Sequence, residues 1–138
     1  MLEAAGVDLS EVGAAMLRVA PAGWTQVVLN VTGAGSMIGT DLDIDLADGG
    51  TTGAVSLDLD GRIACDELRE RMHQTPTGTW YNARIVLGQD RQLEAEFDYD
   101  NPPFNGDATD ELLTEDQDQY PRDPQHLPAW HPSRGPAS

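Results

Sequence analysis

The sequence predicts an α+β fold: one antiparallel sheet of about five strands, helices packed on one face of it, and an extended proline-rich C-terminal strap. Two observations predict this class. Apolar residues recur at helical spacing near the N-terminus and again after residue 62, and the segments between and after them alternate apolar with polar residues. The strands also come in groups separated by helices, which is typical of an antiparallel sheet with helices to one side.

The length and composition indicate one domain, which we place at residues 1–131, with residues 132–138 as a disordered tail. No apolar run is long enough to cross a bilayer, and the N-terminus lacks the features of a signal peptide. Cys65 is the only cysteine, so no internal disulfide is possible. We therefore expect a cytoplasmic protein.

The charge is strongly negative. Twenty-four acids stand against eight basic residues, and the formal net charge is −16. Such a surface repels nucleic acid and anionic membranes, so neither is expected as a partner. It attracts a basic protein and speeds the encounter. Solubility alone explains this charge about equally well.

The first helix is predicted for residues 9–20. Asp8 and Glu11 have the spacing of a capping box. The proline at position 21 ends the helix. Its apolar face is formed by residues at helical spacing: Leu9, Val12, Met16 and Val19.

Three strands should follow. Residues 24–31 are rich in Val and Leu. After a glycine-containing turn, a second strand alternates strictly and carries Asp41, Asp43 and Asp45 on its outer face. Asp48-Gly49-Gly50 predicts a hairpin turn. The alternation then continues in a third strand through Val55, Leu57 and Leu59.

A second helix is predicted for residues 62–74, ending in the turn at residues 75–78. Its apolar face contains Ala64, Leu68 and Met72, and Cys65 is expected to be half-buried. Its charged residues should face water: Glu67, Arg69, Glu70 and Arg71.

Residues 80–104 form the best-patterned hairpin. A turn around Asp90 places four pairs on the core face: Leu87–Leu93, Ile85–Ala95, Ala83–Phe97 and Tyr81–Tyr99. The outer face then carries three pairs: Arg84–Glu96, Asn82–Asp98 and Trp80–Asp100. A slip of one residue would bury Arg84, so the register is well specified. Pro102-Pro103 ends the second strand.

The remainder is acidic and then proline-rich. Asp107 is predicted to cap a short helix that contains Leu112 and Leu113. The proline-rich end cannot form a regular helix. We expect it to pack onto the body as a strap through Tyr120, Leu127 and Trp130.

No convincing catalytic set is present. Cys65 and His73 would lie about 12 Å apart along one helix, too far for a nucleophile and its base. The three histidines lack the spacing of a zinc site. The acids of residues 98–107 offer oxygen ligands for Ca²⁺ or Mg²⁺ but lack the EF-hand pattern, so a solvated acidic turn is favoured. We predict a non-enzyme without metal or cofactor.

The residues predicted to bind a partner lie on the outer sheet face and in the acidic corner after the hairpin. Acids on two strands would form a continuous negative field if the strands share a sheet, and aromatic side chains among them would anchor an Arg-rich partner. Acidic strands also serve solubility or protect sheet edges. The candidates are Asp41, Asp43, Asp45, Trp80, Glu96, Asp98, Asp100, Phe104 and Asp107.

The run TWYNARIVLGQDRQLEAEFDYDNPPF, followed by acids, Tyr-Pro-Arg and a late Trp, resembles the YezG-type immunity proteins of bacterial polymorphic toxin systems. The resemblance is sharp from residue 79 to residue 130, although the chain lacks Lys and has an unusually proline-rich end. It implies a small cytoplasmic α+β protein that blocks a cognate toxin domain, often a nuclease, without catalytic residues. The matching positions are Trp80, Tyr81, Phe97, Asp98, Tyr99, Asp100 and Trp130.

Three functions therefore compete. The first is an immunity protein, favoured because nucleases carry basic clefts that suit an acidic inhibitor. The second is a small acidic scaffold protein without a toxin partner, which a homodimer through a sheet edge would favour. The third is a metal-dependent hydrolase that uses the acids of the corner.

Overall fold

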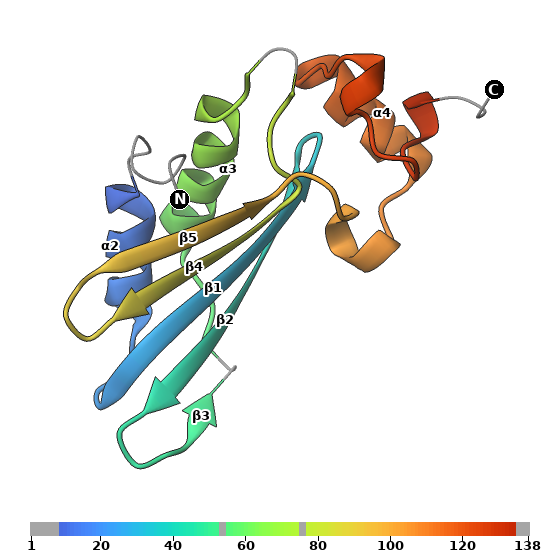
Figure 1. Cartoon of the computed structure of the whole chain (residues 1–138). Helices are drawn as coiled ribbons and strands as arrows, with labels where there is room; N and C mark the ends of the chain where they lie inside the picture. The colour runs from blue at the N-terminus through green and yellow to red at the C-terminus, as the bar shows by residue number, and fades with distance from the viewer. Residues whose placement is uncertain (1–8, 53–54, 75–76, 135–138) are drawn as a thin grey trace.

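The computed structural model describes residues 9–52, 55–74 and 77–134. Its centre is one open antiparallel sheet with the strand order β3-β2-β1-β4-β5. Helices α2 and α3 cover one face of this sheet, and α4 lies beyond one end of the strands (Figure 1). The α+β class, the single antiparallel sheet of five strands and the helices on one face are confirmed.

The helices and strands differ in length from the predicted ones. The helices are α2 (Ser10–Val19), α3 (Leu59–Arg71) and α4 (Asp110–Gln119). The strands are β1 (Trp24–Ala34), β2 (Met37–Leu46), β3 (Thr51–Thr52), β4 (Asn82–Gly88) and β5 (Leu93–Asp98). Three short 3₁₀ turns complete the described chain: η1 (Pro103–Gly106), η2 (Pro124–His126) and η3 (Pro132–Arg134).

The core lies between the sheet and the two helices that cover it. β1 is the central strand and pairs with β2 on one side and β4 on the other. Alternate residues of these strands are buried against α2 and α3 because a strand turns successive side chains to opposite faces. The buried set includes Val27, Leu29, Val31, Leu42, Ile44, Ile85 and Leu87.

The predicted third strand is wrong for residues 55–59. β3 contains only Thr51–Thr52, paired with the end of β2 after the predicted Asp48-Gly49-Gly50 turn. The chain turns into α3 instead, because the Asp58 carboxylate accepts a hydrogen bond from Gly61 N and caps the helix. Leu59, predicted to continue the apolar alternation of that strand, is 63% exposed.

The two covering helices bury apolar faces as predicted. α2 starts after Leu9 without a side-chain cap bond, and the predicted cap Asp8 lies outside the described residues. α3 buries Ala64, Leu68 and also Cys65, which is fully buried rather than half-buried. Burial raises the pKa of the Cys65 thiol to about 12.

The register of the β4–β5 hairpin is confirmed from Leu87–Leu93 to Asn82–Asp98. Beyond that pair the ladder ends, so the predicted pairs of Tyr81 with Tyr99 and of Trp80 with Asp100 are not part of it. Tyr81 N donates instead to the Asp98 carbonyl, at 2.9 Å. The chain before Asn82 therefore no longer alternates between the two sheet faces.

Trp80 was predicted on the outer face, and this prediction is wrong because the residue lies in the core. Its side chain is 0% exposed, packs against the Phe97 ring at 5.7 Å between centroids, and donates from Nε1 to Met72 Sδ. Thr79 and Tyr81 are also buried. Three consecutive buried residues need cover on both sides. It is supplied by α3 and by the C-terminal segment that follows α4 and contains Arg122.

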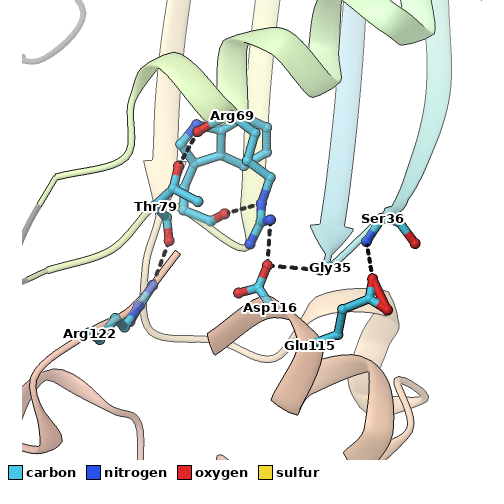
Figure 2. A network of polar contacts seen from close by, with 8 residues as sticks. Gly35, Ser36, Arg69, Thr79, Glu115, Asp116 and Arg122 are labelled. Atoms are coloured by element: carbon cyan, nitrogen blue, oxygen red, sulfur yellow. Dashed lines mark hydrogen bonds and ion pairs between the residues drawn. The ribbon is translucent and has the colours of Figure 1, made fainter. Parts of the chain in front are cut away.

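The prediction that Arg69 faces water is wrong, because this residue is 1% exposed. Its Nη1 lies 2.6 Å from Asp116 Oδ1 of α4, and its Nε donates to the Trp80 carbonyl. Asp116 Oδ1 also accepts from Gly35 N at the β1–β2 turn (Figure 2). This buried ion pair ties α3, the β1–β2 turn and α4 together.

Arg122 fixes the segment that follows α4. It is buried, and its guanidinium lies 4.3 Å from the centroid of the Tyr81 ring. Its Nη2 donates to the Thr79 carbonyl at 2.6 Å (Figure 2), and its Nη1 donates to the Tyr99 carbonyl at 2.9 Å. One arginine thereby joins the C-terminal segment to both ends of the β4–β5 hairpin.

The helix near Leu112 and Leu113 is present, but Thr109 and not Asp107 caps it, because Thr109 Oγ1 accepts from Leu112 N. The strap packs onto the body as predicted, with Leu127 buried and Trp130 edge-on to Tyr81. η2 and η3 interrupt its extended course, and η3 occupies the start of the predicted disordered tail. Residues 135–138 of that tail lie outside the described chain.

Candidate functional site

The sheet face opposite α2 and α3 is the main candidate surface, and we call it the open face. In Figure 1 no described helix lies across the middle of it. The alternation that sends Leu42 and Ile85 into the core sends their neighbours to this face. It is formed by Gln26, Val28, Asn30 and Thr32 of β1, Asp41, Asp43 and Asp45 of β2, Asn82, Arg84 and Val86 of β4, and Glu94, Glu96 and Asp98 of β5.

The acids of the open face form two separate flanks rather than a continuous field. β1 and β4 lie between β2 and β5, so the flanks are about 14 Å apart at the usual strand spacing. The register places Asp41, Asn30, Arg84 and Glu96 in one row across the four strands. The sequence prediction was correct about the shared sheet and wrong about continuity.

Arg84 is the positive group at the centre of this row. Its side chain is exposed, and no ion pair joins it to Glu96 among the described residues, although the two are cross-strand neighbours. Asn30 and Asn82 flank it on β1 and β4. This row therefore presents one arginine between two acidic borders.

A groove of about 880 Å³ lies at the end of the open face where η1 follows the hairpin. Its floor contains Asn30 and Arg84, and acids of both flanks, Asp41 and Glu96, reach it. The Phe104 side chain also lines it. The groove thus combines opposite charges, amides and one aromatic ring in a single hollow.

Phe104 is held over the sheet by a strained turn. Phe104 and Asn105 both have φ of 54°, a left-handed conformation that costs roughly 1–3 kcal/mol per non-glycine residue. The Phe104 amide donates to Thr32 Oγ1 at 2.7 Å, which anchors the turn to β1. A Cβ added at Gly39 would meet the Phe104 ring at 3.2 Å, so glycine makes room for the ring.

The acidic corner at residues 98–101 is a hydrogen-bonded turn. Asp98 Oδ1 accepts from the amides of Asp100 and Asn101, and its Oδ2 accepts from Asn101 Nδ2. Although partial desolvation acts to raise the pKa of Asp98, these hydrogen bonds hold it below its ordinary value. Its carboxylate is thus engaged with its own turn. In the described part of the chain, no group of three or more His, Cys, Asp or Glu side chains is placed to hold a metal ion.

We expect Asp98→Asn to lower the free energy of unfolding by about 1 kcal/mol at pH 7, because a charged acceptor is lost from three hydrogen bonds. Because the pKa of Asp98 is lower in the folded state than in the unfolded state, its carboxylate stabilises the fold at pH values above the unfolded-state pKa, near 3.8. This stabilisation is lost as the pH falls through the folded-state pKa. The difference between the proteins should therefore fade below about pH 4. Urea titrations from pH 3 to 7 measure it, and equal stability at pH 7 would contradict it.

Asp100→Asn is the matched control. Asp100 is exposed, and its carboxylate makes no hydrogen bond to the described residues, although its main-chain carbonyl accepts from Trp130 Nε1. This variant should keep the stability of the native protein across the same pH range. A loss equal to that of Asp98→Asn would assign the effect to corner charge rather than to the turn.

The nine predicted partner-binding residues thus separate into groups. Asp41, Glu96, Asp98, Asp100 and Phe104 come together around the groove. Asp43 and Asp45 extend the β2 flank, and Asp107 is exposed after η1 without lining the groove. Trp80 is excluded by its burial.

Sequence reasoning missed three parts of this region. Arg84 was treated only as the cross-strand neighbour of Glu96 and not as the centre of the open face, and Asn30 was not singled out. The buried arginines that position the hairpin, Arg69 and Arg122, were also missed. The register of the central strands would have identified Asn30 and Arg84 as neighbours, had the position of β1 been known.

No family model and no curated protein matches the chain. The described helices include none that is long and apolar enough to span a membrane.

Proposed function

We propose that this chain is a cytoplasmic immunity protein that binds and neutralises a cognate bacterial toxin domain with a basic surface, such as a nuclease. The observation that carries the proposal is the open face: four strands whose outer surface no described helix covers, acidic along both borders and hollowed at one end. An uncovered sheet face with this charge is suited to a basic protein partner. The net charge of −16 adds long-range attraction.

The arrangement of the charges suggests how the partner is held. Asp41 and Asp43 on one flank and Glu94 and Glu96 on the other would attract basic side chains on both sides of the contact. Arg84 between the flanks requires an acceptor from the partner, such as a carboxylate or a main-chain carbonyl. A uniformly basic surface would leave Arg84 unpaired, so this residue would select among basic partners.

Neutralisation would follow from occlusion. A toxin that grips phosphate through a basic cleft would lose access to its substrate when the acidic flanks and the Phe104 ring cover that cleft. The chain would need no chemistry of its own for this role. Its one thiol is buried with a raised pKa, which suits packing rather than nucleophilic attack.

Co-expression tests the proposal directly. Secreted toxins and their immunity proteins are expected to be encoded side by side, so the C-terminal domain of a large secreted protein encoded next to this chain is the toxin to use. Cells that express that domain alone should stop growing, and this chain should restore growth and co-purify with the domain. If cells that express both proteins do not grow, the proposal is refuted. A stable homodimer of this chain that binds no toxin would favour a scaffold role.

A further inference from the structure

β5 forms a second surface, at the edge of the sheet. The strand order leaves β3 and β5 as the two edge strands, and β3 contains only two residues. β5 contains six residues, and within the described part of the chain it is paired on one side only, by β4. A long edge strand presents main-chain donors and acceptors that a further strand can bind.

The hydrogen-bond pattern shows which groups of β5 point outward. Gly33 N donates to the Tyr81 carbonyl, so odd-numbered residues of β4 bond toward β1. Gly88 N donates to the Gln92 carbonyl, so even-numbered residues of β4 bond toward β5. Because bonding alternates along a ladder, the main chains of Leu93, Ala95 and Phe97 point away from β4. Among the described residues, nothing hydrogen-bonds these outward amides and carbonyls.

The side chains along this edge specify the chemistry of a bound strand. On the open-face side, Glu94 and Glu96 are exposed. On the core side, Leu93 and Phe97 are only partly buried, so an added strand would cover their remaining apolar surface. A complementary strand would therefore alternate basic residues on one side with apolar residues on the other.

We propose that β5 accepts a strand of alternating basic and apolar residues from the partner protein, extending the sheet by one strand. The inference rests on the proposed function in that the strand would belong to the toxin held by the open face. A second copy of this chain fits poorly, because pairing two β5 edges would bring Glu94 and Glu96 of each copy against one another.

The probe is the blocked peptide Lys-Val-Lys-Val-Lys-Val, and the readout is hydrogen exchange at each main-chain amide of the full chain. At saturation, exchange at Ala95 and Phe97 should slow at least tenfold, because their amides gain acceptors. The control peptide has the central valine replaced by proline and keeps the charge. Unchanged exchange at Ala95 and Phe97, or equal slowing by both peptides, would overturn the proposal.

Three variants place the contact on β5. Ala95→Pro removes one outward amide, at a position where an edge strand tolerates proline, and should weaken peptide binding at least tenfold. Ala95→Ser retains the amide and should bind as the native chain does. Glu94→Lys with Glu96→Lys keeps every main-chain donor and should transfer binding to the peptide Glu-Val-Glu-Val-Glu-Val. Retention of the lysine peptide by this double variant would refute the charge pattern.

The peptide experiment and the co-expression experiment fail independently. Peptide binding without restored growth would leave the strand-accepting edge in place and refute the toxin partner. Restored growth without slowed exchange at Ala95 and Phe97 would leave the immunity function in place and refute strand addition.

Discussion

Asp116→Ala is expected to lower the free energy of unfolding by about 3–5 kcal/mol, because it leaves the Arg69 guanidinium buried without a counterion. The ion pair between these side chains is almost fully buried, with exposures of 1% and 5%. Asp116 also accepts the Gly35 amide, which would lose its partner in the variant. Urea unfolding followed by tryptophan fluorescence measures the loss.

The chain contains a matched control. Arg18 and Asp58 form the other described ion pair, with exposures of 49% and 43%. Arg18→Ala removes that pair at the surface, where solvent screens it, so its effect should be far smaller. Equal losses for Arg18→Ala and Asp116→Ala would contradict the special role of the buried pair.

The double variant Arg69→Met with Asp116→Leu separates burial of charge from loss of contacts. Replacing both partners removes the uncompensated charge, so this variant should be more stable than Asp116→Ala alone. Arg69 also lies 5.2 Å from the centroid of the Tyr120 ring and donates to the Trp80 carbonyl, so its removal still loses contacts. A double variant less stable than Asp116→Ala would show that these contacts outweigh the ion pair.

The parts of the fold that the sequence could predict are the strands that bury one face. The strands at residues 37–46 and 82–98 were predictable because each buries one face, and burial of one face leaves a period of two in the sequence. The β4–β5 register followed for the same reason. These are local patterns that need no knowledge of distant segments.

The failures are residues whose environment is made by distant segments. Arg69 lies among charged residues on α3, and only the docking of α4 makes it a buried residue. Trp80 continues the alternation of the hairpin on paper, yet its side chain is buried against Arg69 of α3, Met72 and the Phe97 ring. Residues 55–59 alternate like a strand, but the Asp58 side chain caps α3 and the chain enters the helix instead.

The candidate site was half predictable. The outward acids of residues 41–45 and of residues 94–98 are visible as alternation. Their separation depends on strand order, because β1 precedes β2 in sequence yet lies between β2 and β4. The groove likewise needs the left-handed turn at Phe104, at a residue type that rarely adopts this conformation.

Reversing charge on the open face should have the largest effect on function. Asp41→Lys with Asp43→Lys is expected to slow association with the co-expressed toxin domain at least tenfold at low salt and to abolish restored growth. Both side chains are exposed on β2, so stability should change little. Stopped-flow binding at several salt concentrations measures the rate, and the difference from the native chain should shrink as salt increases.

The control is Glu67→Lys with Glu70→Lys on α3, which covers the other face of the sheet. Each reversal adds two charges, so both variants carry −12 instead of −16. If net charge alone attracts the toxin, the two variants will slow association equally. If the open face is the binding surface, the α3 variant will keep a near-native rate and restore growth. The comparison therefore separates a general acidic character, which many proteins share, from a surface built to receive a basic partner.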